Sequence, residues 1–213
     1  MHAPSFAAHA HWLLGEDAQA DAVSRECVQR ARDLGEPYCL AVVLSYRAVL
    51  DQMRGDRDGL AATAAEVLGL CDEYGFGYYR DWALILGGWS SPNGSGTALA
   101  RRGIASLRAA GAFARMPYWL SLHADLQVRD GDPIAARSAL DAAVAAAHAH
   151  DDVWWLPEVM RQRAALDTDR AAAARLRAAA DLAAAHGSVA LLRRCEEDLA
   201  NGGRGVRGRS GPG

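Results

Sequence analysis

The strongest constraint on the fold is the even spacing of aromatic residues along the chain. Tyr38, Tyr78, Tyr118 and Trp154 follow one another at intervals of 40, 40 and 36 residues. Such a period is typical of helical hairpins that stack side by side, each burying one face against the next. The sequence therefore predicts an array of antiparallel helix pairs, about five in number, with one closing helix at 188–200.

Short turn sequences divide the chain between these marks, because glycine, aspartate, serine or proline recurs where a helix needs a cap. We expect helix breaks at 13–17, 34–37, 54–58, 74–77, 90–96, 110–117, 129–133, 148–152, 166–169 and 186–188. The segments between the breaks show helical rather than strand-like spacing, as in the apolar stripe of Leu60, Ala64, Val67, Cys71 and Tyr74.

The sequence thus predicts an all-α fold, a TPR-like right-handed superhelix of antiparallel helix pairs, which is an α-solenoid. This domain should cover residues 1–200, and the Gly- and Arg-rich end, 201–213, is predicted to be disordered because it has no apolar stripe. The helix at 2–14 has no preceding partner. We expect it to pack on the next pair or to join a homodimer interface, since uncapped ends of repeat arrays are apolar.

Composition and charge exclude several classes of protein. With 23 basic and 26 acidic side chains the net charge is −3, so the chain lacks the basic excess that direct binding of nucleic acid requires. No apolar window is long enough for a membrane span, and the N-terminus has no basic leader, so we expect neither a membrane helix nor a signal peptide. The four cysteines form no Cys-x-x-Cys pair and are expected to be reduced core thiols of a cytoplasmic protein.

Residues with catalytic or metal-binding potential are present but poorly spaced. They are the histidine pairs 9/11 and 148/150 and the cluster Ser121, His123 and Asp125. Residues two apart on a helix point to different sides, which disfavours both a shared metal ion and a catalytic triad. The glycines of "GGWSSPNGSG" follow no strand and precede no lysine, so a phosphate-binding loop lacks its context. We therefore expect no enzymatic activity, no metal and no cofactor.

Tryptophan and tyrosine gather on alternate helices, including the doublets 78–79, 118–119 and 154–155. Adjacent helical residues point about 100° apart, so each doublet is predicted to place one ring in the core and one in a concave groove. The alternative is that both rings pack between repeats. Glu158 and Arg161 have the spacing of an ion pair on a solvated helix face. The predicted groove residues are Tyr38, Tyr46, Tyr79, Trp82, Trp119, His123, Trp155, Glu158 and Arg161.

Several segments in order resemble one family. They are "GEPYCLAVVLSYRAVLDQMRGD", "AEVLGLCDEYGFGYYRDWALILGGW", "GIASLRAAGA", "PYWLSLHADLQVRDGDPIAARSALDAAVAAA" and "WWLPEVMRQRAAL". Together they resemble the tetratricopeptide-like C-terminal repeat region of adenylate-cyclase-like ATP-binding proteins and LuxR-type transcriptional regulators of bacteria. The resemblance covers roughly residues 12–200 and implies an all-α repeat module that follows a nucleotide-binding ATPase domain. Because the sequence contains no Walker A loop, cyclase domain or helix-turn-helix, only the repeat module is carried over.

We therefore expect a non-catalytic interaction or regulatory module of bacterial signal transduction or transcriptional control. Its partner would be a protein or peptide segment, such as an ATPase or cyclase domain encoded nearby, docked in the aromatic concave face. One alternative is a small-ligand sensor with a closed pocket lined by Trp119, His123 and Trp155. A second alternative is a degenerate structural remnant of a larger cyclase-like ATPase, with every aromatic ring buried.

Overall fold

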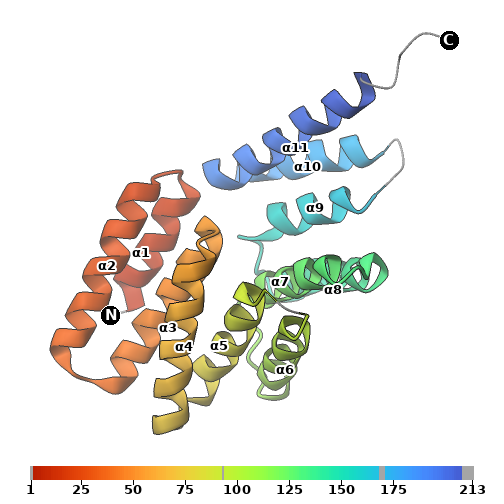
Figure 1. The fold of residues 1–213 in the computed structure, drawn as a ribbon. Coiled ribbons are helices and arrows are strands. Elements are labelled where there is room, and N and C mark those ends of the chain that lie inside the picture. Colours follow the sequence, from red (N-terminus) through yellow and green to blue (C-terminus); the bar gives the residue numbers. More distant parts are fainter. Residues whose placement is uncertain (1, 93, 168–170, 208–213) are drawn as a thin grey trace.

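The computed structural model describes residues 2–92, 94–167 and 171–207, and across these ranges the chain is helical without a strand (Figure 1). The helices are α1 (His2–Leu13), α2 (Asp17–Leu34), α3 (Pro37–Arg54), α4 (Arg57–Tyr74), α5 (Gly77–Ser90), α6 (Gly96–Ala109), α7 (Met116–Arg129), α8 (Pro133–Ala149), α9 (Leu156–Ala165), α10 (Ala172–Ala185) and α11 (Val189–Arg207). Each predicted break falls where one of these helices gives way to the next, although the break at 166–169 lies partly outside the described residues. The turn residues therefore predict the division of the chain correctly.

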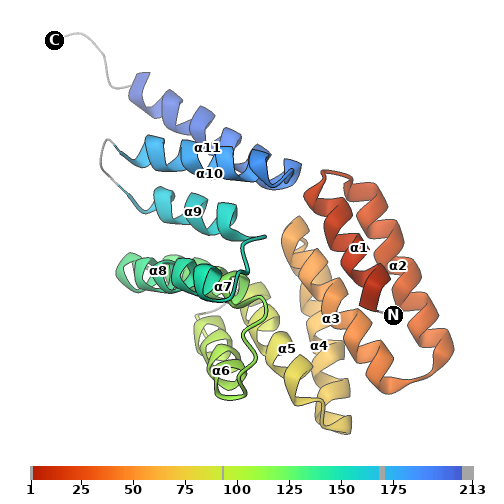
Figure 2. The same cartoon turned by 180° about the vertical axis from the view of Figure 1, so that it is seen from behind.

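The helices form two layers (Figures 1 and 2). The odd-numbered helices make the inner layer, in which α1 contacts α3, α3 contacts α5, and so on to α11. Each even-numbered helix packs against its two neighbours in sequence, and between even-numbered helices the Arg32–Glu66 ion pair joins α2 to α4. The aromatic-rich helices are the odd-numbered ones, so the large rings lie in the inner layer.

The two kinds of helix differ in how much of their surface is buried. The outer helix α4 buries the stripe of Leu60, Ala64, Val67 and Cys71, as predicted, while Tyr74 at its end is exposed. The inner helix α3 has neighbours on several sides and is buried over 41–46 and again over 48–53. Burial around a whole helix requires apolar residues on every side, whereas one stripe suffices for an outer helix.

Left-handed residues end most of the helices at a constant interval. Gly15, Gly35, Gly55 and Gly75 have positive φ at steps of 20 residues, as do Gly111, Gly131 and Asp151. Glycine adopts this conformation without the steric cost that a Cβ atom brings, and it terminates a helix by letting the chain turn back. Asp151 is the one non-glycine residue in these two series, and its φ is 52°.

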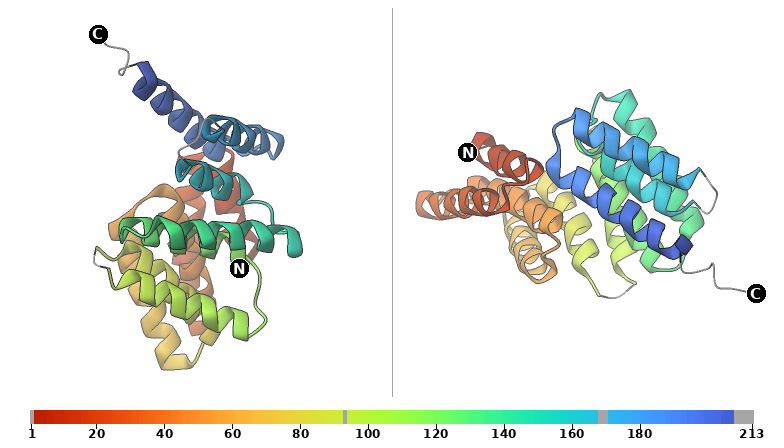
Figure 3. Two further views of the ribbon diagram at one scale, coloured as in Figure 1. Left: turned by 90° about the vertical axis from the view of Figure 1, so that its right-hand side faces the viewer. Right: turned by 90° about the horizontal axis from the view of Figure 1, so that it is seen from above.

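The first and last helices contact each other. α1 packs on α2 and α3, which confirms the first of its two expected placements, and it also contacts α11. Figure 3 shows the start of α11 beside the end of the first hairpin. The rings of Trp12 and Trp155 are 6.2 Å apart at this junction, and Arg194 of α11 lies over both rings. The inner layer is therefore closed by a contact between its first helix and its last.

The last helix is longer than expected. α11 extends to Arg207, past Ala200, where the sequence predicts its end. The rest of the predicted tail, 208–213, lies outside the described residues. Within the described ranges, no helix combines the length and the apolar character needed to span a lipid bilayer.

Candidate functional site

The aromatic residues predicted to line a concave groove lie mainly in the core. Tyr46, Tyr79, Trp82, Trp119 and Trp155 are each at most 7% exposed. Their rings pack on one another across the inner layer, with centroids 5.6 Å apart for Tyr46 and Trp82 and 4.9 Å for Trp82 and Trp119. The protein's own rings therefore fill the inner layer at these positions, and of the predicted groove aromatics only Tyr38, at the start of α3, is largely exposed.

The aromatic doublets behave in two ways. In the pairs Tyr78–Tyr79 and Trp154–Trp155 the second ring is buried and the first is at least partly accessible. The helical angle accounts for Tyr78 and Tyr79, whereas Trp154 and Trp155 lie in the loop before α9 and not on the helix that the sequence predicts. Tyr118 and Trp119 are both fully buried, so the prediction was wrong for this pair. The cause is the central position of α7, which is surrounded by α5, α6, α8 and α9.

Glu158 and Arg161 form a buried ion network, which corrects the prediction of a solvated pair. Glu158 is 3% exposed and accepts hydrogen bonds from Nε and Nη2 of Arg161 at 2.9 and 2.8 Å. Arg161 also donates to Asp198, and Arg194 lies 3.5 Å from Glu158. Burial alone would raise the pKa of Glu158, but the hydrogen bonds from Arg161 hold it below its usual value. This network joins α9 to α11.

The remaining polar candidates face separate neighbours. His123 is half-buried, and burial lowers its pKa. The Ser121 hydroxyl accepts a hydrogen bond from the indole N–H of Trp155 at 3.0 Å, while the Asp125 carboxylate accepts one from Trp89 at 2.7 Å. These three side chains therefore do not converge. Among the described residues, no group of three histidine, cysteine or acidic side chains is arranged to hold a metal ion.

A cleft lies elsewhere, between α1 and the loops that precede α7, α9 and α11. Two adjoining cavities of about 690 and 570 Å³ form it. Both are lined by Ala10, Leu13, Asp151, Asp152 and Trp154. The first cavity also contacts Phe6, His9, Ala114, Arg115, Phe113 and His150, and the second contacts Leu14, Val153, His186, Gly187 and Ser188. Cavities of this volume with a mainly apolar lining are typical of ligand-binding sites.

The rim of this cleft carries large apolar side chains that are open to solvent. Phe6 on α1 and Leu14 just after it are 50% and 52% exposed, and Phe113 on the loop before α7 is 38% exposed. Phe113 stacks on His150 with ring centroids 4.6 Å apart, which connects the two loops across the cleft. Exposed apolar side chains gathered around a hollow are a mark of binding surfaces.

Arg115 is the cation of the cleft. Its guanidinium lies over four aromatic rings, 5.1 Å from Trp154, 5.3 Å from both Phe6 and Tyr46, and 5.6 Å from Trp82. The residue is 9% exposed, and its φ of 62° is left-handed, a conformation that is uncommon for a residue with a Cβ atom. Cation–π contacts of this kind offset part of the cost of burying a charge.

His9, on α1, contacts the guanidinium of Arg115. Its Nε2 lies 2.8 Å from the backbone carbonyl of Tyr46, which can only accept, so Nε2 carries the proton. The other ring nitrogen, Nδ1, is therefore an acceptor and faces Nη2 of Arg115 at 3.4 Å. Burial, together with the charge of Arg115, lowers the pKa of His9 to about 3. His9 is consequently neutral at physiological pH.

The two loops facing α1 are fixed by a hydrogen bond between them. The backbone N–H of Arg115 donates to the Asp152 carboxylate at 2.7 Å, and burial raises the pKa of Asp152. These loops, 110–115 and 150–155, are six residues long, whereas 35–36, 55–56 and 75–76 have two. The cleft residues Phe6, Leu13, Phe113, Arg115 and Trp154 were missed by sequence reasoning. The extra loop length was the signal that could have found the three loop residues, Phe113, Arg115 and Trp154.

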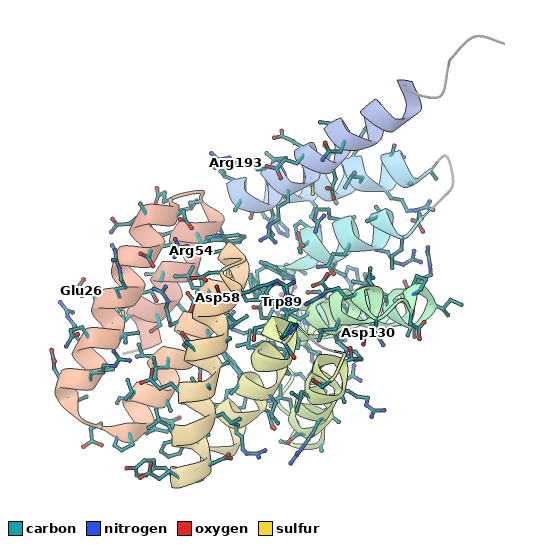
Figure 4. The ribbon with its side chains drawn as sticks, viewed as in Figure 1. Glu26, Arg54, Asp58, Trp89, Asp130 and Arg193 are labelled. Carbon is teal, nitrogen blue, oxygen red and sulfur yellow. The ribbon has the colours of Figure 1, made fainter. Side chains whose placement is uncertain are left out.

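A more polar cavity of about 650 Å³ lies where the inner layer closes. It is lined by residues of the turns after α1 and α3 and by the start of α11, including Arg54, Arg193 and Glu197. Figure 4 shows Arg54 at the end of α3 and Arg193 at the facing start of α11. Arg54 is already paired with Asp17 and Asp21, so its charge is satisfied within the protein.

Fold and site together define an all-helical protein with an apolar cleft, in which the guanidinium of Arg115 is surrounded by aromatic rings. No family model matches the chain, and no solved structure matches it. Over 197 residues the chain is 26% identical to an uncharacterized protein of Rhizobium meliloti (strain 1021). The match covers 88% of this chain but spans 19% of the length of that relative.

Proposed function

We propose that this chain is a non-catalytic helical-repeat module that docks a segment of a partner protein in the cleft between α1 and the loops before α7, α9 and α11. The fold would be a TPR-like right-handed superhelix, in which hairpins of about 40 residues stack in sequence. The alternating inner and outer helices support this assignment. The resemblance to repeat regions of bacterial regulators supports a role for the module in cytoplasmic signalling or transcriptional control.

The observation that carries the proposal is the continuity of the two apolar cavities along α1. They share five lining residues and follow one face of the helix from Phe6 to Leu14. At a rise of 1.5 Å per residue, this face is about 12 Å long, enough for several residues of an extended segment. The rings around it supply apolar anchors, each worth roughly 1–3 kcal/mol when buried by a partner.

The test is a selection of peptides with a blocked variant as the control. Ala10 lines both cavities and is exposed on α1, so Ala10→Arg should fill the cleft without disturbing the core. Random peptides displayed on phage would be selected on the wild-type chain and then measured on Ala10→Arg. Ala22→Arg, at an exposed site on the outer helix α2, is the matched control.

We expect selected peptides to lose at least about tenfold in affinity on Ala10→Arg and to keep their affinity on Ala22→Arg. Peptides that bind both variants as well as the wild type would place the binding surface elsewhere. A selection that enriches no binder would also contradict the docking function.

A further inference from the structure

We infer that the cleft receives a carboxylate, and that Arg115 is the residue that binds it. This inference rests on the proposed docking function and specifies the chemistry of the docked segment. The segment would present an aspartate or glutamate side chain next to an apolar one, with the carboxylate on Arg115 and the apolar side chain along α1.

The first argument is that the charge of Arg115 is incompletely matched. A guanidinium has five N–H donors, and Arg115 uses one toward His9 at 3.4 Å, with a further interaction at the Tyr46 hydroxyl. Among the described side chains, no carboxylate forms an ion pair with it; Asp152 is engaged by the backbone N–H of Arg115 instead. The charge of Asp152 acts on Arg115 without a hydrogen bond to the guanidinium. The guanidinium therefore keeps N–H donors that no carboxylate among the described residues accepts, and a carboxylate is the acceptor that fits it with two parallel hydrogen bonds.

The second argument is that the backbone holds this arginine in place. Arg115 precedes the first residue of α7 and keeps a left-handed φ of 62°. Such a conformation is unfavourable for a residue with a Cβ atom, and here the hydrogen bond to Asp152 maintains it. The backbone of Arg115 is thereby held at the N-terminus of a helix of 14 residues, whose dipole favours an anion near that end.

The third argument is the distribution of charge along the cleft. Arg115 lines the first cavity but not the second, and no other arginine or lysine lines either cavity. Asp151 and Asp152 line both cavities and repel an anion throughout the cleft, so an anion is favoured only in the first cavity, where Arg115 offsets their charge. They also disfavour a doubly charged phosphate relative to a singly charged carboxylate. The carboxylate therefore belongs at the end near Phe6 and Phe113, with its apolar neighbour toward Leu13.

A pair of small probes tests this assignment directly. 3-Phenylpropionate carries an apolar ring and a carboxylate, and 3-phenylpropionamide is its neutral counterpart of nearly the same shape. Each would be titrated into the full chain at pH 7.5 and followed by backbone-amide NMR shifts. The chain variants are Arg115→Gln and, as the matched control, Arg129→Gln, because Arg129 also lies over a ring, Trp89 at 5.0 Å, but outside the cleft.

We expect the acid to bind at least about tenfold more tightly than the amide, as charge-assisted hydrogen bonds do relative to neutral ones. The shifts should fall on 6–13, 113–115 and 150–154. Arg115→Gln should remove the preference for the acid, and Arg129→Gln should keep it. If Arg115→Gln unfolds the chain, the comparison of acid with amide on the wild type still decides the question.

Equal affinity for acid and amide would overturn the inference, as would shifts confined to the polar cavity of Arg54 and Arg193. Either outcome leaves the docking function standing if the selected peptides still depend on Ala10. Loss of the Ala10 dependence would instead remove the docking function itself.

Discussion

At the scale of single residues, the cleft depends on a histidine that is kept neutral by burial. His9 has a pKa lowered from 6.5 to about 3, so below pH 6.5 the unfolded chain binds a proton that the folded chain does not. The contribution of His9 is therefore complete above pH 6.5 and declines as the pH falls toward 3. Protonation would also place a second cation beside Arg115 and remove the acceptor at Nδ1.

We predict that the free energy of unfolding falls between pH 7.5 and 5.0 by roughly 2 kcal/mol through His9 alone, from the linkage relation at 1.36 kcal/mol per pH unit. The measurement is urea unfolding of the wild type and His9→Gln at both pH values. Glutamine can donate to the Tyr46 carbonyl but does not titrate, so the difference between the two proteins isolates His9. The same pH dependence in both would show that His9 does not carry it.

Sequence reasoning reaches some of these residues and misses others for a physical reason. The spacing of Glu158 and Arg161 correctly predicts that the two side chains meet. It does not predict their burial, because Asp198 and Arg194 come from α11, about 40 residues further along the chain. Arg115 was missed for the same reason: its rings come from α1, α3 and α5 and from the loop before α9.

At the scale of helices and turns, local chemistry is sufficient to predict the helix bounds, because a helix ends where a cap and a left-handed residue allow it to end. The predicted breaks match the helix bounds for this reason. The orientation of each helix depends instead on its neighbours, so the prediction for Tyr118 and Trp119 failed on the central helix α7. The length of the cleft loops is also a local feature, so their six residues could have been recognised in the sequence.

Asp151 allows a test of the turn series at this scale. It occupies a left-handed position 20 residues after Gly131, where a Cβ atom is unfavourable. We predict that Asp151→Gly raises the free energy of unfolding by about 0.5–1 kcal/mol, measured by urea denaturation. The reciprocal change, Gly131→Ala, should lower it by about 1 kcal/mol, since a Cβ atom there meets no neighbour within 4 Å and only the conformation is penalised. Destabilisation by both changes would contradict this account.

At the scale of the whole molecule, the contact between α1 and α11 changes how stability is distributed. In an open repeat array each hairpin contacts only its neighbours, so the ends fray independently. Here Trp12 of α1 contacts both Trp155, which precedes α9, and Arg194 of α11. Arg194 also lies over Trp155 and donates to the Met53 carbonyl of α3. The periodicity of the sequence predicts the stacking of neighbours but contains no information on this closure, which depends on the summed rotation of all the hairpins.

We predict that Trp12→Ala opens the closure and weakens α11 as well as α1. Trp12 is 7% exposed, and truncation of a buried tryptophan costs roughly 3–5 kcal/mol. Amide hydrogen exchange followed by mass spectrometry should show exchange in α11 accelerating at least about tenfold more than in α6. Ile104→Ala in α6 is the control, because Ile104 is also buried and lies outside the closure, so it should accelerate α6 and its neighbours first. If Trp12→Ala leaves α11 as protected as in the wild type, the two ends are not coupled, and the chain behaves as an open array whose terminal helices only touch.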